Sequence, residues 1–270
     1  MALIHYTDLN AVVSILTEPK LRFTDLRYLN DKAEFKHGVE QLCNAFTIVM
    51  PSWMEYHPRS KAAREYVHNA LQRAVSDFSQ YNPYFVMSLS RRSDLLSQWR
   101  GYGHYAIEFN EEELTRQIPS LRECIYGETE QQQAALQCLS DAIIIVSKDF
   151  QSNDVVGIKG AEAITTLYEL ASTFKNGGFV EEQETRLIVD EVPNGGIQYR
   201  VRGQMLIPYI ERPITLDCIK AIHVGPMADQ GAALLSMRGF CERIERDWQI
   251  ESSNIEYWIE VIGSKIPFRA

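Results

Sequence analysis

Residues 174–190 read FKNGGFVEEQETRLIVD, and this stretch decides how the chain is expected to fold. After the glycine pair, Glu182, Glu184 and Arg186 alternate along a segment that continues as Leu-Ile-Val at 187–189. Side chains of a strand alternate between its faces, so the three charged groups are expected on one face. A buried carboxylate costs free energy unless it is paired, so one interpretation is a salt-bridged edge with Arg186 as counter-ion. The apolar continuation instead favours acids at the mouth of a core strand, where a catalytic site would place them.

The bulk composition is that of an ordinary globular protein, with 270 residues, 45% of them hydrophobic and 23% charged. A net charge of −9 disfavours non-specific binding to DNA or RNA, which needs a basic surface. No apolar run approaches a membrane span, and the beginning MALIHYTDLN lacks the form of a signal peptide. The five cysteines are odd in number and lack zinc-ligand spacing. We therefore expect a cytoplasmic protein with reduced core thiols, no metal and no membrane partner.

The periodicity of apolar residues predicts strands and helices along the whole chain. Strands are expected at 3–7, 21–26, 84–90, 104–110, 121–127, 184–192, 197–210, 218–224 and 256–262, and helices at 8–18, from 30 or 31 onward, 60–80, 128–148, 160–175 and 228–244. The helices lie mostly between strands, which predicts an α+β fold: a single domain over residues 1–270 with a helical insertion at 30–80. The first strand should join the common sheet, because so short a strand cannot form a sheet alone.

The first strand carries a polar cluster in the sequence IHYT. His5 and Thr7 share the face opposite Ile4 and Tyr6. A lone strand histidine is most often a hydrogen-bonded structural residue, so His5 by itself carries little weight as a site residue.

A second polar cluster follows the strand at 84–90. Ser88 and Ser90 alternate along that strand, and Trp99 and Tyr102 lie in the glycine-flanked segment QWRGYG. Aromatic residues beside glycines are either simple loop packing or walls that stack on a flat heterocycle.

Taken in order, these short motifs resemble a bacterial family catalogued only as domain of unknown function 2971. The resemblance rests on His5-Tyr6-Thr7, Asn30-Asp31-x-x-Glu34, Ser88-x-Ser90, Trp99-x-x-Tyr102, Glu182-x-Glu184-x-Arg186, Gly225-Pro226 and the closing SKIPFRA. Phe268 stands where that family has a tyrosine. The family in turn looks like a distant relative of ADP-ribosyltransferases, which implies a mixed or antiparallel split sheet.

The resemblance implies an NAD-binding cleft built from the polar clusters. His5, with its neighbours Tyr6 and Thr7, would hold the adenosine-side ribose, and Ser88 and Ser90 would brace the cleft. Tyr102 would stack on nicotinamide and Trp99 would close the wall, although Tyr105 competes with Tyr102 for that role.

The same resemblance assigns the chemistry to the late acidic segment. Glu184 would accept a hydrogen bond from the 2′-hydroxyl of the nicotinamide ribose and stabilise the oxocarbenium-like cation formed when nicotinamide leaves. Glu182 would orient the incoming nucleophile or act as partner of an arginine, and Arg186 would support the strand.

The implied function is an NAD-dependent ADP-ribosyltransferase that releases nicotinamide and modifies an unknown protein or nucleic-acid acceptor, as a toxin or phage-defence effector does. The alternative is a non-catalytic module that senses a nucleotide or contacts a protein through the same cleft. A hydrolase using Glu182 and Glu184 as an acid/base pair is disfavoured, because neighbouring acids on one strand face do not oppose each other across a bond.

Overall fold

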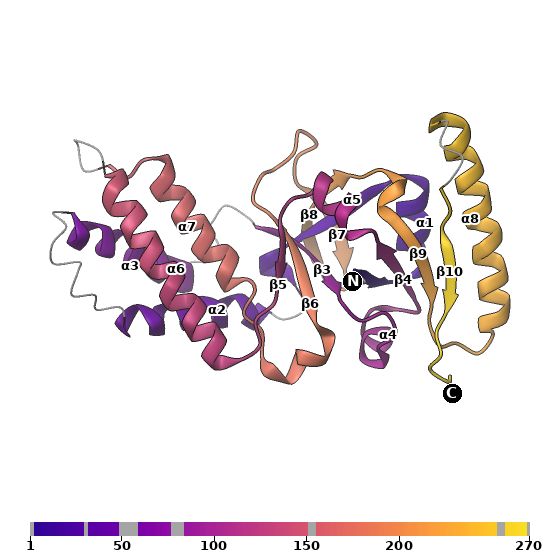
Figure 1. Cartoon of the computed structure of the whole chain (residues 1–270), viewed down its shortest axis with the longest axis horizontal. Helices are drawn as coiled ribbons and strands as arrows, with labels where there is room; N and C mark the ends of the chain where they lie inside the picture. Colours follow the sequence, from indigo (N-terminus) through magenta and orange to yellow (C-terminus); the bar gives the residue numbers. More distant parts are fainter. Residues whose placement is uncertain are drawn as a thin grey trace. The chain divides into compact units, whose positions relative to one another are not determined.

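A computed structural model describes residues 3–29, 32–48, 59–76, 84–150, 155–252 and 257–268. These residues confirm the predicted α+β class, with a mixed, open sheet and helices between its strands (Figure 1). The chain divides into two compact units. The first comprises Met1–Thr24, Phe85–Glu123 and Glu181–Ala270, and the second comprises Asp25–Tyr84 and Cys124–Val180.

The sheet runs in the order β10-β9-β4-β1-β3-β2-β8-β7, with β6 added to β3 and β5 added to β6. The pairs β1–β3, β1–β4, β2–β8, β3–β6, β4–β9, β5–β6 and β7–β8 are antiparallel, and β9–β10 is parallel. The first strand joins this sheet, as predicted. The strands are β1 (Ile4–Thr7), β2 (Lys20–Asp25), β3 (Phe85–Ser90), β4 (Tyr105–Phe109), β5 (Leu121–Glu123), β6 (Glu184–Val189), β7 (Gln198–Arg202), β8 (Met205–Pro213), β9 (Ile219–Val224) and β10 (Glu260–Gly263).

The sheet forks at β3, which has three strand neighbours. Strand β6 pairs with β3 along its whole length, from Phe85 to Ser90. Strand β1 meets β3 only where Ile4 lies opposite Ser90, and β2 is also a neighbour of β3. A strand has two edges, and β6 occupies one of them, so β1 and β2 share the other edge and separate along it.

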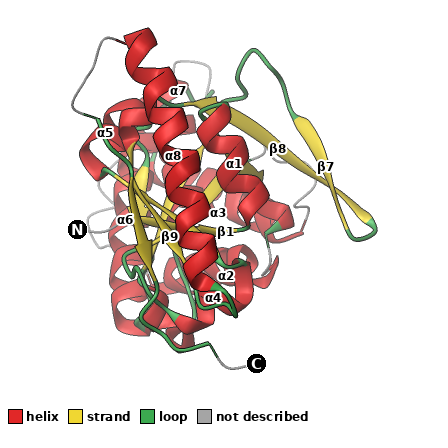
Figure 2. Cartoon of the chain, turned by 90° about the vertical axis from the view of Figure 1, so that its right-hand side faces the viewer, coloured by secondary structure: helices red, strands yellow, loops and turns green. Residues whose placement is uncertain are grey.

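The larger core of the first unit lies on one face of the sheet. Helices α1 (Leu9–Thr17), α5 (Glu111–Gln117) and α8 (Gln230–Ser252) pack there, and Figure 2 shows α1 and α8 lying across the strands. Their apolar stripes bury residues such as Leu16, Leu114 and Met237 against Met87 and Ile222 of the sheet.

Helix α4 (Leu96–Tyr102) lies against a smaller apolar cluster of the same unit. That cluster consists of Ile4 and Tyr6 from β1, Trp99 from α4 and Ala106 from β4. The alternation of side chains along β1 therefore sends Ile4 and Tyr6 to α4, and Leu3 to the larger core.

The second unit is helical and contains α2 (Lys32–Ile48), α3 (Ser60–Ser76), α6 (Glu128–Asp149) and α7 (Ile158–Ala171). Helix α6 buries Leu139, Ile143 and Val146 at helical spacing. Helices α2 and α3 fall within the predicted insertion at 30–80, and they share their unit with α6 and α7. The single domain over 1–270 with that insertion stays a prediction, and the expected cap at Asn30 or Asp31 lies outside the described residues.

One strand prediction was wrong. Residues 197–210 do not form a single strand but the hairpin of β7 and β8, because Gly203 adopts a φ of 60° that turns the chain back. Helices α4 and α5 were not predicted, since each has only seven residues and leaves little periodic signal. Within the described ranges, no helix combines the length and the apolar character needed to cross a membrane.

Candidate functional site

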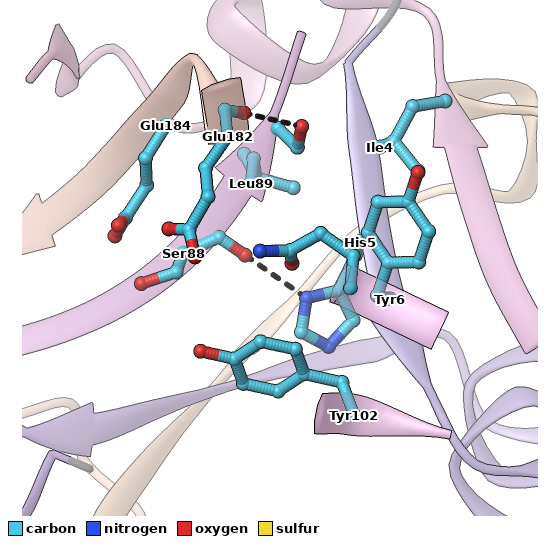
Figure 3. A pocket seen from close by; sticks show the side chains of 10 residues that line it. Ile4, His5, Tyr6, Ser88, Leu89, Tyr102, Glu182 and Glu184 are labelled. Atoms are coloured by element: carbon cyan, nitrogen blue, oxygen red, sulfur yellow. Dashed lines mark hydrogen bonds between the residues drawn. The ribbon is translucent and has the colours of Figure 1, made fainter. Parts of the chain in front are cut away.

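A small pocket lies where β1 and β3 begin to separate, and we call it the His5 pocket. Its volume is about 60 Å³. Four segments of the first unit line it: Ile4, His5 and Tyr6 on β1, Ser88, Leu89 and Ser90 on β3, Gln98 and Tyr102 on α4, and Glu182 just before β6 with Glu184 at its first position. Figure 3 shows the His5 ring joined to Ser88, with Tyr102 on one side of it and the two acids on the other.

The fork of the sheet explains how His5 is held. Strand β1 leaves β3 after Ile4, and the His5 Nδ1 atom instead lies 3.0 Å from the Ser88 carbonyl oxygen. A carbonyl only accepts, so Nδ1 carries the proton and Nε2 of the neutral ring is an acceptor. Burial lowers the pKa of His5, the hydrogen bond to Ser88 opposes this, and the positive charge of Arg200 lowers it further. His5 is therefore neutral at pH 7.

Glu184 and Arg186 share one face of β6 and form a buried ion pair. The Arg186 Nε atom donates to Glu184 Oε1 over 2.6 Å. Arg186 is only 2% exposed, and a cation at that depth requires a charged or strongly hydrogen-bonding partner. The pair therefore fixes the Glu184 carboxylate at the wall of the His5 pocket.

The prediction that Glu182 lies on the same strand face as Glu184 was wrong. Glu182 ends the 3₁₀ helix η4 (Gly177–Glu182), and β6 begins only after Gln183, whose φ of 43° reorients the backbone. Two hydrogen bonds hold this turn: Ser90 Oγ donates to the Glu182 carbonyl over 2.6 Å, and the Arg91 amide donates to the Gln183 carbonyl over 3.0 Å. The turn still brings both acids to the pocket.

Helix α4 presents Gln98 and Tyr102 to the pocket from positions four residues apart, which lie on the same helix face. Tyr102 is 43% exposed, and the other nine lining residues are buried or half-buried. Sequence reasoning missed Gln98. Its spacing from Tyr102 was the available signal, but the segment QWRGYG was interpreted as a loop and not as a helix.

The other aromatic candidates lie elsewhere. Trp99 is 2% exposed, packs edge-on against Tyr6 with ring centres 4.7 Å apart, and donates its indole N–H to Asp94 over 2.8 Å. Trp99 does not line the His5 pocket. Tyr105 packs against the larger core of the first unit, so of the two competing tyrosines it is Tyr102 that lines the pocket.

The remaining predicted residues of the first strand have backbone partners. The Tyr6 hydroxyl donates to the Arg92 carbonyl over 2.6 Å and accepts from the Leu95 amide over 3.1 Å, and burial raises its pKa to about 12. Thr7 pairs with Tyr105 at the far end of β1 and does not line the pocket. Tyr6 thus anchors the loop between β3 and α4, and it also lines the pocket.

The described residues contain no group of three or more His, Cys, Asp or Glu side chains placed to hold a metal ion. The polar side chains that line the His5 pocket offer a neutral imidazole, two phenols, two serine hydroxyls, a carboxamide and two carboxylates.

Comparison with known proteins gives one family match. Residues 98–187 match the model of a family described as protein of unknown function (DUF2971). The matched segment contains Gln98, Tyr102, Glu182 and Glu184, whereas His5 lies outside it. No curated protein and no solved structure matches the chain. The similarity to the DUF2971 family therefore covers residues 98–187, about a third of the chain.

Proposed function

We propose that the His5 pocket receives the nicotinamide-ribose end of NAD and that the protein transfers ADP-ribose to a macromolecular acceptor with release of nicotinamide. One observation carries the proposal: His5, Tyr102 and the acids Glu182 and Glu184 come from separate segments of the chain and line one pocket. The ordered motifs resemble the DUF2971 family, and the likeness of that family to ADP-ribosyltransferases supports the choice of NAD.

The neutral His5 ring and Tyr102 would position the substrate. With Nδ1 engaged by Ser88, Nε2 can accept a hydrogen bond from a ribose hydroxyl. The exposed Tyr102 ring can stack on a flat heterocycle at the rim. The Gln98 carboxamide can both donate and accept, which suits the carboxamide of nicotinamide.

In the proposed reaction the bond between C1′ of the ribose and the nicotinamide nitrogen breaks, and its electron pair leaves with nicotinamide. The cation left on the ribose is stabilised by the Glu184 carboxylate, which Arg186 holds in place. An acceptor nucleophile then bonds to C1′ and transfers its proton to Glu182 or to water. A fixed carboxylate of this kind favours the transition state over the ground state, because the positive charge develops only as the bond breaks.

The size of the pocket limits how NAD would enter. A volume of about 60 Å³ holds a few water molecules and is well below the roughly 300–1,000 Å³ of typical ligand pockets. The proposal therefore requires Tyr102, the exposed lining side chain, to rotate outward, and it leaves the adenosine part of NAD outside the enclosed volume.

A second candidate function is nucleotide sensing without turnover. The buried Glu184–Arg186 pair favours it, because a carboxylate already neutralised by a guanidinium stabilises a developing cation less.

Incubation with labelled NAD and cell lysate separates the two functions. Wild-type protein is compared with Glu184→Gln and with Glu181→Gln, an exposed acid of the same segment that does not line the pocket. Transfer of label to protein or nucleic acid, lost in Glu184→Gln and kept in Glu181→Gln, is the expected result. Binding of NAD without label transfer or nicotinamide release supports sensing, and an absence of binding contradicts both.

A further inference from the structure

We infer that the protein has a second ligand site, independent of the His5 pocket, which binds a drug-sized organic anion with an apolar body. The site is a pocket of about 650 Å³ at the opposite side of α4, and we call it the C-terminal pocket. This volume falls within the range typical of small-molecule sites, whereas that of the His5 pocket does not.

The walls of the C-terminal pocket are apolar and come from three separated segments. They are Leu96 and Trp99 of α4, Pro226 after β9, and Ile266, Pro267 and Phe268 of the segment after β10. Leu96 and Phe268 are exposed, so the pocket offers apolar surface that a ligand can cover.

A network of hydrogen bonds holds these walls in place. The Asp94 carboxylate accepts from the Trp99 indole N–H over 2.8 Å, from Ser264 Oγ over 2.6 Å and from the Lys265 amide over 2.9 Å. The Gln230 side-chain amide donates to the Ser264 carbonyl over 3.2 Å and to the Val224 carbonyl over 3.1 Å. Because α4 and the C-terminal segment are both fixed to Asp94, the pocket is preformed.

Glycine at 225 permits the close approach of the walls. A Cβ atom there would lie 2.8 Å from Trp99 Cε3 and 3.1 Å from the His104 carbonyl oxygen, and the Gly225 amide donates to that same oxygen over 2.8 Å. The motifs QWRGYG, GP and SKIPF, which have no shared role at the His5 pocket, therefore converge on the walls of the C-terminal pocket.

Charge selects the kind of ligand. Arg100 and His104 line the pocket with exposed side chains, and none of the nine lining residues is acidic. This contrasts with the chain as a whole, which carries a net charge of −9. The nearby Asp94 is already engaged by three donors. A carboxylate, sulfonate or phosphate on an apolar body would meet a guanidinium and an imidazole while its body covers the walls.

Titration with anilinonaphthalene sulfonate, a fluorescent aromatic anion, tests the inference, with uncharged phenylnaphthylamine as its neutral counterpart. Wild-type protein should bind the anion saturably at one site. Replacing the guanidinium and the imidazole together, Arg100→Gln with His104→Gln, should raise the Kd for the anion about tenfold and leave the Kd for the neutral probe unchanged. Phe268→Ala should weaken both probes, since it removes apolar wall without removing charge.

Matched variants on the exposed face of α8 serve as controls. Arg238→Gln and Leu235→Ala remove an exposed cation and an exposed apolar side chain outside both pockets, and they should leave both Kd values unchanged. All substituted residues are exposed, so thermal melting should match that of the wild type. The inference is overturned if the wild type does not bind the anion saturably, if the pocket variants bind it as the wild type does, or if loss of Arg100 and His104 weakens the neutral probe equally.

Discussion

Glu184 combines a structural role with the chemical role that we propose for it, so the stability of its variants must be measured before their activity is interpreted. Its bond to the buried Arg186 predicts that Glu184→Gln lowers the free energy of unfolding by about 3 kcal/mol, because a neutral amide replaces the carboxylate that accepts from Arg186 Nε. Urea unfolding checks this. Glu181→Gln, which changes an exposed acid three residues earlier, should shift stability by no more than about 0.5 kcal/mol. Equal stability of the two variants would show that the ion pair does not stabilise the fold.

Tyr102 offers a cleaner test of ligand contact, because its exposed ring contributes little to the core. If the ring stacks on nicotinamide, Tyr102→Ala should raise the Kd for NAD about tenfold, as loss of one stacking aromatic typically does. Isothermal titration calorimetry measures this directly. The control is Tyr199→Ala on β7, which removes another exposed tyrosine outside the pocket. An unchanged Kd in Tyr102→Ala would remove this residue from the proposed NAD site.

Glu108 makes the stability of the first unit dependent on acid pH. The Glu108 carboxylate accepts hydrogen bonds from His223 Nε2 over 2.8 Å and from Lys220 Nζ over 2.7 Å. These bonds lower the pKa of Glu108 from 4.5 to about 2, with the bond from His223 as the largest cause, whereas burial acts in the opposite direction. Because the pKa of Glu108 is lower in the folded than in the unfolded protein, the ionised carboxylate adds to the free energy of unfolding. This contribution is fully present above about pH 4.5 and is lost as the pH falls toward 2. The loss should be about 3 kcal/mol.

Urea unfolding at a series of acid pH values tests this contribution. The stability of the wild type should fall across that window, and that of Glu108→Gln should fall less steeply, since the titrating group is gone. Parallel profiles for the two proteins would assign the acid sensitivity to other carboxyls.

At the scale of elements, two glycines predict opposite effects of the same substitution. Gly225→Ala should destabilise by about 2 kcal/mol, because its Cβ would lie 2.8 Å from the buried Trp99 ring. Gly239→Ala, within α8 and with no heavy atom within 4 Å of the added Cβ, should stabilise by up to about 1 kcal/mol. Thermal and urea unfolding of both variants give the signs. If both substitutions destabilise the protein, the space beside Gly239 is not open to an added methyl group.

Long periodic elements were predictable from sequence, whereas short ones and turns were not. The spacing of apolar residues correctly indicated α1 and α6, since each buries a regular face. The short apolar segment at 84–90 indicated β3, which is buried at five of its six residues. Helix α4 is too short for that signal, so Gln98 was missed. The left-handed conformation of Gln183 could not be foreseen, because a glutamine gives no local signal for positive φ.

At the scale of the whole molecule, the candidate site depends on strand order. Local patterning identified His5 and Glu184 as polar residues in unusual positions, but only the pairing of β1 and β6 with β3 brings them to one pocket. Such contacts between distant segments leave no trace in local periodicity. The motif resemblance predicted that these residues lie in one cleft. Nothing in the sequence predicted the C-terminal pocket.

The division into two units also follows from long-range connections. Each unit is assembled from separated segments, so neither corresponds to one continuous stretch of sequence. Helices α6 and α7 are separated in sequence from α2 and α3 but share a unit with them. The boundaries of this unit therefore cannot be predicted from local composition along the chain.

The most direct test of the central claim is the rate of nicotinamide release from NAD by the purified full chain, measured chromatographically for the wild type and for Glu184→Gln. Both proteins are assayed at a temperature where circular dichroism shows them fully folded, so that loss of stability does not count as loss of chemistry. We predict release by the wild type and a rate about 10²–10³-fold lower in Glu184→Gln. No release by wild-type protein that binds NAD, or an undiminished rate in the folded variant, would contradict the assignment of this carboxylate to glycosyl transfer.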